Sequence, residues 1–189
     1  MPTAAPTMTR KTWTDEELAT LPKDGHKYEL LDGDLIMSPV HANHGYICMR
    51  LGAILLHFCE GRKLGKVYDS STGFRLPEDL LLSPDVSFVS KARLKEIEVA
   101  PDKFLAGAPD LVIEVLSPSD RMAQIKRKLE HYFEHGGKLA WLVNWRKQQV
   151  HVYTPNTDNI TELTAPEDVL NGGVVLPGFK CKLRQIFPP

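Results

Sequence analysis

Apolar and polar positions recur along this 189-residue chain with two different periods. Over residues 44–60 the apolar positions return every three or four residues, which predicts a helix with one buried stripe and an end near Gly61. The same spacing over residues 121–135 predicts a second helix, ended by Gly136 and Gly137.

Strand patterns fill much of the remaining chain. Residues 28–37 predict a hairpin, because Asp32 and Gly33 between two apolar-rich arms readily take the positive φ angles of a tight turn. The nearly continuous apolar run at 111–116 is typical of a central strand covered on both faces. Further strands or extended segments are predicted over 66–69, 73–76, 86–89, 139–143, 150–153 and 174–187, and short helices at 14–18 and 91–98. We expect a mixed α/β fold with a partly antiparallel sheet, one domain over residues 14–189 and a flexible tail over 1–13.

Composition narrows the class of protein. No apolar run approaches the roughly 20 residues that cross a bilayer, and Cys48, Cys59 and Cys181 form no CxxC pair. We expect buried thiols, a cytoplasmic location and no membrane partner. A net charge of −1 argues against a strongly basic nucleic-acid coat protein but not against a local basic groove. Basic candidates for such a groove are Arg50, Arg62, Lys63, Lys66, Arg121, Lys126 and Arg127.

Three acidic residues stand beside or within apolar strands. Glu114 lies inside the 111–116 run, where burying a carboxylate is costly unless a cation, a metal ion or several donors compensate it. The pattern leaves open whether it pairs internally with a basic side chain or serves as a metal ligand or catalytic acid. Asp85 follows Pro84 and opens a strand, which by itself favours turn chemistry. Asp110 also follows a proline, and we expect a structural role for it.

Local pattern predicts a surface position for Glu29 and does not decide which lysine of the second helix belongs to a site. Glu29 alternates with apolar neighbours in the first hairpin arm, which predicts a side chain facing solvent. In the second helix, Lys126 and Lys128 lie at opposite edges of the apolar stripe while Arg127 points away. Periodicity does not choose between the two lysines.

Motifs for several common activities are missing. The chain has no GxxxxGK[ST], GxGxxG or GxSxG sequence, so triphosphate hydrolysis, dinucleotide binding and hydrolase-elbow catalysis have no support. No HExxH or His-x-His pattern occurs either. His41 and His44 precede the first long helix, and we interpret them as a polar helix entry rather than as ligands.

Taken together, the segments resemble one known family. The chain is similar to the Uma-type family of putative restriction endonucleases, within the PD-(D/E)XK nuclease superfamily. The resemblance covers about residues 14–187. It is carried by residues 28–39, His44, 83–89, 109–119, 128–132 and 141–143.

The resemblance implies a restriction-endonuclease-like core, a mixed central sheet flanked by helices. It implies a Mg²⁺- or Mn²⁺-dependent endonuclease in which Asp85 and Glu114 hold the metal, with the carbonyl of Val115 as a further ligand. Nucleic acid, with DNA favoured, would be the substrate. A homodimer, common among restriction enzymes, would be the assembly.

One position departs from the superfamily pattern. A lysine is expected two residues after the second acid, and Leu116 stands there. The resemblance places the matching lysine on the following helix, at Lys128, and adds Glu29 as a further acid of the site. A milder departure is Asn144-Trp145, where relatives often have Asp-Pro. The alternative hypothesis is a nuclease fold that binds without turnover.

Overall fold

The computed structural model describes residues 13–14, 17–18, 20–22, 27–38, 41–77, 79–97, 103–118, 120–157 and 159–187. Residues 1–12 of the predicted tail, and residues 15 and 16 of the predicted helix at 14–18, lie outside the described residues. Trp13, at the end of that predicted tail, packs against a cluster containing Leu30 and Leu81.

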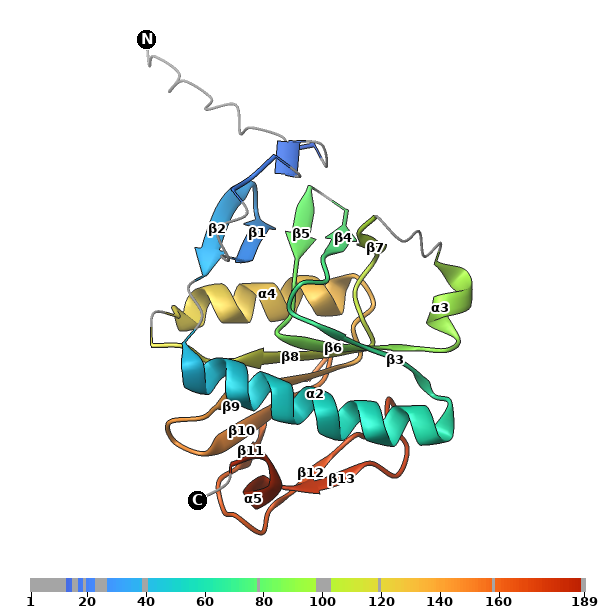
Figure 1. Cartoon of the computed structure of the whole chain (residues 1–189), viewed down its shortest axis with the longest axis vertical. Coiled ribbons are helices and arrows are strands. Elements are labelled where there is room, and N and C mark those ends of the chain that lie inside the picture. Colours follow the sequence, from blue (N-terminus) through green and yellow to red (C-terminus); the bar gives the residue numbers. More distant parts are fainter. Residues whose placement is uncertain are drawn as a thin grey trace.

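A six-stranded mixed sheet forms the centre of the molecule (Figure 1), in the order β11-β10-β9-β8-β6-β3. Strand β8 lies in its interior, as its apolar sequence predicted, and runs parallel to β9 and antiparallel to β6. A five-stranded sheet has the order β2-β1-β5-β4-β7, and β12 pairs with β13. The bounds are β1 Lys27–Leu31, β2 Asp34–Ser38, β3 Gly65–Asp69, β4 Phe74–Leu76, β5 Leu80–Leu82, β6 Val86–Ser90, β7 Leu105–Ala106, β8 Leu111–Val115, β9 Leu139–Asn144, β10 Gln149–Tyr153, β11 Thr161–Leu163, β12 Val169–Asn171 and β13 Lys180–Lys182.

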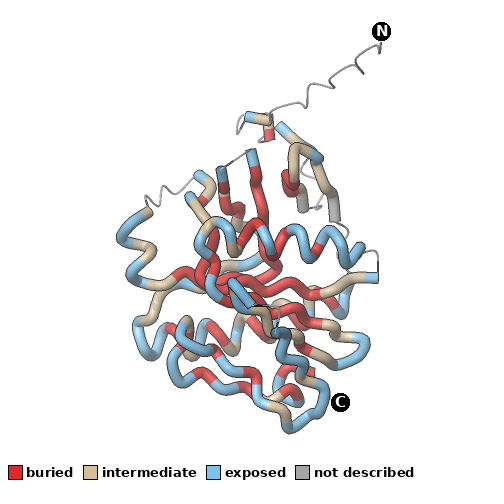
Figure 2. The backbone as a smooth tube through the Cα atoms, turned by 180° about the vertical axis from the view of Figure 1, so that it is seen from behind, coloured by how far each residue is buried: buried red, intermediate tan, exposed pale blue. Residues whose placement is uncertain are grey.

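Two helices cover opposite faces of the central sheet (Figure 1). Helix α2 (Ala42–Arg62) packs its apolar stripe against alternate side chains of β8, Ile113 and Val115 among them. Helix α4 (Met122–Glu134) packs on the other face, where Val112 joins the cluster. Because side chains alternate along a strand, Glu114 points to the same side as Val112, toward α4. Figure 2 shows the buried residues concentrated at the centre of the molecule.

The predicted hairpin is present and is tied to α4. Asp32 and Gly33 have φ angles of 52° and 82°, as a tight turn between β1 and β2 requires. The Asp32 carboxylate lies 3.1 Å from Nε of Arg127 and 2.9 Å from Nε2 of His131. The turn therefore holds β1 beside α4, which matters for Glu29.

One predicted boundary was confirmed and one was wrong. Helix α2 ends at Arg62, next to Gly61, because Lys63 takes the left-handed conformation and its N–H donates to the carbonyls of Cys59 and Glu60. The C-terminal stretch is not extended throughout: α5 (Leu183–Ile186) follows β13 directly. The short predicted surface helix is present as α3 (Arg93–Glu96). Within the described ranges, none of the helices is both long and apolar enough to span a bilayer.

Candidate active site

Glu114 and Lys128 form the centre of a buried charged cluster. Glu114 is 3% exposed on β8, and Lys128 is 6% exposed on the facing side of α4. Lys128 Nζ lies 2.7 Å from Oε1 of Glu114. The choice that periodicity left open is thus decided: Lys128 is buried and Lys126 is exposed.

Glu29 joins the same ammonium group, and the expectation that it faces solvent was wrong. Its carboxylate oxygens lie 2.9 and 3.1 Å from Lys128 Nζ, and its Oε1 also accepts a hydrogen bond of 2.8 Å from the N–H of Ser83. The alternation rule failed because it assumes one solvated face. Here Leu30 packs in a cluster on one side of β1, while Leu31, on the side of Glu29, packs with residues of α4.

Asp85 reaches the cluster from the start of β6. The register pairs Val86 with Ile113, so Asp85 lies opposite Glu114, one step farther along two antiparallel strands. Its Oδ2 accepts a hydrogen bond of 2.8 Å from the N–H of Val115 and lies 3.1 Å from Nε2 of His44. Asp85 is therefore buried beside the end of β8 rather than exposed in a turn.

The charges around Lys128 keep it protonated. Burial acts to lower the pKa of Lys128, but the negative charges of Glu114 and Glu29, with a smaller effect of Asp85, outweigh burial and hold the pKa above its ordinary value. An ammonium group in this state donates hydrogen bonds and stabilises negative charge. It is not a proton acceptor.

The cluster contains more acid than base. Three buried carboxylates, from Glu29, Asp85 and Glu114, surround the one ammonium of Lys128. A divalent cation would balance this excess, and carboxylate oxygens are the donors that Mg²⁺ and Mn²⁺ prefer. The donor set thus fits the metal that the resemblance implies, with Asp85 and Glu114 as its carboxylates.

Asp110 has the structural role that the sequence predicted. Its carboxylate is 1% exposed, lies 2.6 Å from Lys138 Nζ and accepts a hydrogen bond of 2.8 Å from the N–H of Ser90. Burial acts to raise the pKa of Asp110, but these two partners outweigh it and lower the pKa. The residue fastens β6 and β9 to the start of β8, away from Lys128.

Two residues of the site were missed by sequence reasoning. His44 is 8% exposed and contacts Asp85, whereas His41 is exposed, so only His41 fits the predicted polar helix entry. The helical spacing could have indicated that His44 is buried, because His44 continues the stripe of buried residues on α2 that includes Ile47 and Leu51. Tyr132 lies one turn after Lys128 and is fully buried. Burial, together with the charges of Glu114, Glu29 and Asp85, raises its pKa well above the usual value.

Several of the basic groove candidates are occupied elsewhere. Arg50 donates two hydrogen bonds to the carbonyl of Gln185, Arg62 lies over the ring of Phe58, and Arg127 pairs with Asp32.

Comparison with known proteins agrees with this architecture. The structure is similar to a crystal structure described as a putative nuclease belonging to DUF820 from Anabaena variabilis ATCC 29413, with a TM-score of 0.78, 20% sequence identity and coverage of 91% of this chain and 96% of that one. At that identity the likeness establishes a shared fold. No curated protein matches the sequence. A family model described as Uma2, putative restriction endonuclease, matches residues 15–184, so the chain belongs to the Uma2 family.

Proposed function

We propose that this protein is a divalent-metal-dependent endonuclease that hydrolyses phosphodiester bonds of nucleic acid, with DNA as its substrate. The observation that supports this most is the meeting of Asp85 and Glu114, 29 positions apart in the sequence, at neighbouring register positions beside the ammonium of Lys128. Membership of a family of nuclease-like proteins supports the same reaction class.

Each residue has a role that its surroundings allow. Asp85 and Glu114 would hold Mg²⁺ or Mn²⁺, with the carbonyl of Val115 as a further ligand. A metal ion held at this place would neutralise the phosphate and lower the pKa of a bound water. The protonated Lys128 stabilises the negative charge that develops on the phosphate oxygens. Glu29 positions Lys128 by accepting from its ammonium group.

The position of Lys128 also accounts for Leu116. The lysine expected two residues after the second acid is replaced by one that arrives from α4, and its Nζ still lies 2.7 Å from the Glu114 carboxylate. A change of the element that carries the lysine therefore preserves the pairing of acid and ammonium.

The test is cleavage of plasmid DNA, oligonucleotide DNA and RNA with Mg²⁺ or Mn²⁺. We expect cleavage by the parent protein and a loss of about a hundredfold or more for Glu114→Gln or Asp85→Asn. Glu130→Gln is the matched control, because Glu130 is an exposed acid on α4. Circular dichroism checks that each variant is folded. Absence of cleavage on every substrate, or equal cleavage by Glu114→Gln, would overturn the proposal.

The second candidate is a nuclease fold that binds without turnover, favoured by Leu116 and by a net charge of −1. Calorimetric binding of Mn²⁺ or of DNA by the parent, lost in Asp85→Ala and accompanied by no cleavage, would favour it. The predicted homodimer is tested by sedimentation equilibrium. The single-domain organisation and the cytoplasmic location stay predictions.

A further inference from the structure

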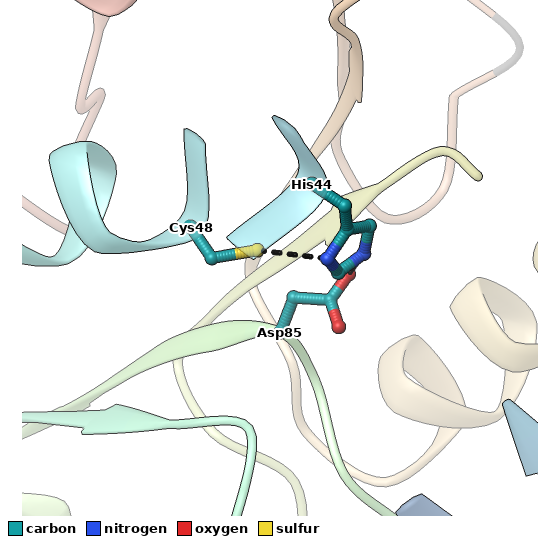
Figure 3. A group of neighbouring side chains, drawn as sticks. All are labelled: His44, Cys48 and Asp85. Carbon is teal, nitrogen blue, oxygen red and sulfur yellow. Dashed lines mark hydrogen bonds and ion pairs between the residues drawn. The ribbon is translucent and has the colours of Figure 1, made fainter. Parts of the chain in front are cut away.

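A second group of metal-ligand side chains lies on the α2 side of Asp85. His44 and Cys48 are one helical turn apart on α2, and the Sγ of Cys48 lies 3.5 Å from Nδ1 of His44 (Figure 3). The other ring nitrogen, Nε2, lies 3.1 Å from Oδ2 of Asp85. One donor atom from each of the three residues falls within 4.8 Å of the others.

We infer that His44, Cys48 and Asp85 bind a zinc ion at a position distinct from the oxygen-ligand metal position of the proposed nuclease site, with Asp85 common to both. A thiolate, an imidazole and a carboxylate form a donor set that suits Zn²⁺, whereas Mg²⁺ and Mn²⁺ prefer oxygen donors alone. The spacing fits as well. Tetrahedral Zn²⁺ with bonds of about 2.3 Å to sulfur and about 2.0 Å to nitrogen holds those two atoms about 3.5 Å apart.

Charge and burial agree with a cation at this place. The thiolate and the carboxylate together neutralise Zn²⁺. His44 and Asp85 are buried, and one donor atom from each of the three residues already lies within 4.8 Å of the others. The imidazole of His44 can bind one ion through only one of its two nitrogens. Zinc would therefore replace either the Nδ1 contact with Cys48 or the Nε2 contact with Asp85.

The site is open to solvent on one side. His44, Cys48 and Asp85 all line a cavity of about 380 Å³ between α2 and the edge strand β3. Its other walls are largely apolar, with Met49, Leu56 and Val67 among them, and Asp69 adds a further carboxylate to the lining. Three protein ligands leave a fourth tetrahedral position, which would hold a water molecule from this cavity.

Sharing of Asp85 gives the zinc site a regulatory consequence, and this part rests on the proposed function. An Asp85 carboxylate that binds zinc on the α2 side is less available to the ion held with Glu114 on the α4 side. Zinc is therefore expected to inhibit cleavage supported by Mn²⁺. The metal-binding inference itself does not depend on cleavage.

Metal binding is tested on the full chain without nucleic acid. Calorimetry with Zn²⁺ and absorption spectroscopy with Co²⁺, which takes the same donors and reports a bound thiolate by a charge-transfer band, are run on the parent, on Cys48→Ala and on Cys59→Ala. Cys59 is the matched control because it is a buried cysteine on the same helix. We expect one zinc ion per chain and a thiolate band that is lost only in Cys48→Ala. The zinc affinity of that variant should be at least about tenfold lower than that of the parent.

Two results would overturn the inference: a Co²⁺ complex without a thiolate band, or equal zinc affinity in Cys48→Ala and the parent. Inhibition is tested separately, and zinc should inhibit Mn²⁺-supported cleavage at a lower concentration for the parent than for Cys48→Ala. Equal inhibition of the two proteins would refute the regulatory part. A parent that binds zinc through Cys48 but never cleaves would refute the proposed nuclease and leave the zinc site standing.

Discussion

Replacing Lys128 by methionine keeps an unbranched side chain only one atom shorter but removes the ammonium group between Glu29 and Glu114. Lys128 is 6% exposed and its Nζ lies 2.7 Å from Glu114 and 2.9 Å from Glu29, so solvent does not screen these pairs. Removing one partner of a buried ion pair costs about 3–5 kcal/mol, because the remaining charge is left uncompensated. The raised pKa of Lys128 means that its contribution is complete at pH 7 and is lost only as the pH rises through that raised value.

Urea denaturation at pH 7, followed by circular dichroism, measures this loss. For a chain of this size it corresponds to a fall in melting temperature of about 6–20 °C. The difference in unfolding free energy between Lys128→Met and the parent should narrow as the pH falls toward about 4, because glutamates take up protons there. Lys126→Met, an exposed lysine on the same helix, should change stability by at most about 0.5 kcal/mol. An effect of Lys128→Met as small as that of Lys126→Met would refute the assignment of Lys128 as the counter-ion of the cluster.

Three further changes test the surrounding fold. Asp110→Asn should lower the free energy of unfolding by about 1.5–3 kcal/mol at pH 7, because a charged carboxylate bonded to Lys138 becomes a neutral amide. Since the pKa of Asp110 is lowered, the difference in unfolding free energy between parent and variant should shrink as the pH falls below 3.8, the ordinary pKa of the group. Urea titrations at several pH values measure this, and a difference that does not change with pH would contradict it. Gly33→Ala should destabilise by about 1 kcal/mol, because Gly33 has a φ of 82°, and an unchanged urea midpoint would argue against the turn. Phe179→Ala should cost about 3–5 kcal/mol, because its buried ring stacks on Trp141 at 5.6 Å, and a loss below about 1 kcal/mol would contradict that packing.

Family resemblance and local pattern predicted much of the candidate site by different routes. Glu114 could be found from pattern alone, because a carboxylate inside an apolar strand needs compensation wherever the strand lies. Asp85, Lys128 and Glu29 needed the resemblance, since each has an ordinary local setting: a proline turn, a charged helix face and an alternating strand. The geometry brings all four side chains together, and whether they act in catalysis stays a prediction.

The sequence by itself determined the two main helices, the hairpin and the central strand, because periodicity and turn chemistry act over a few neighbouring residues. Tertiary structure decided which faces are buried. The covering of both sides of β1 places Glu29 in the interior, and the packing of α4 on the central sheet selects Lys128 over Lys126. It also decided that His44 and Cys48 meet Asp85, since strand register and helix placement bring together groups 41 residues apart, which no local pattern encodes.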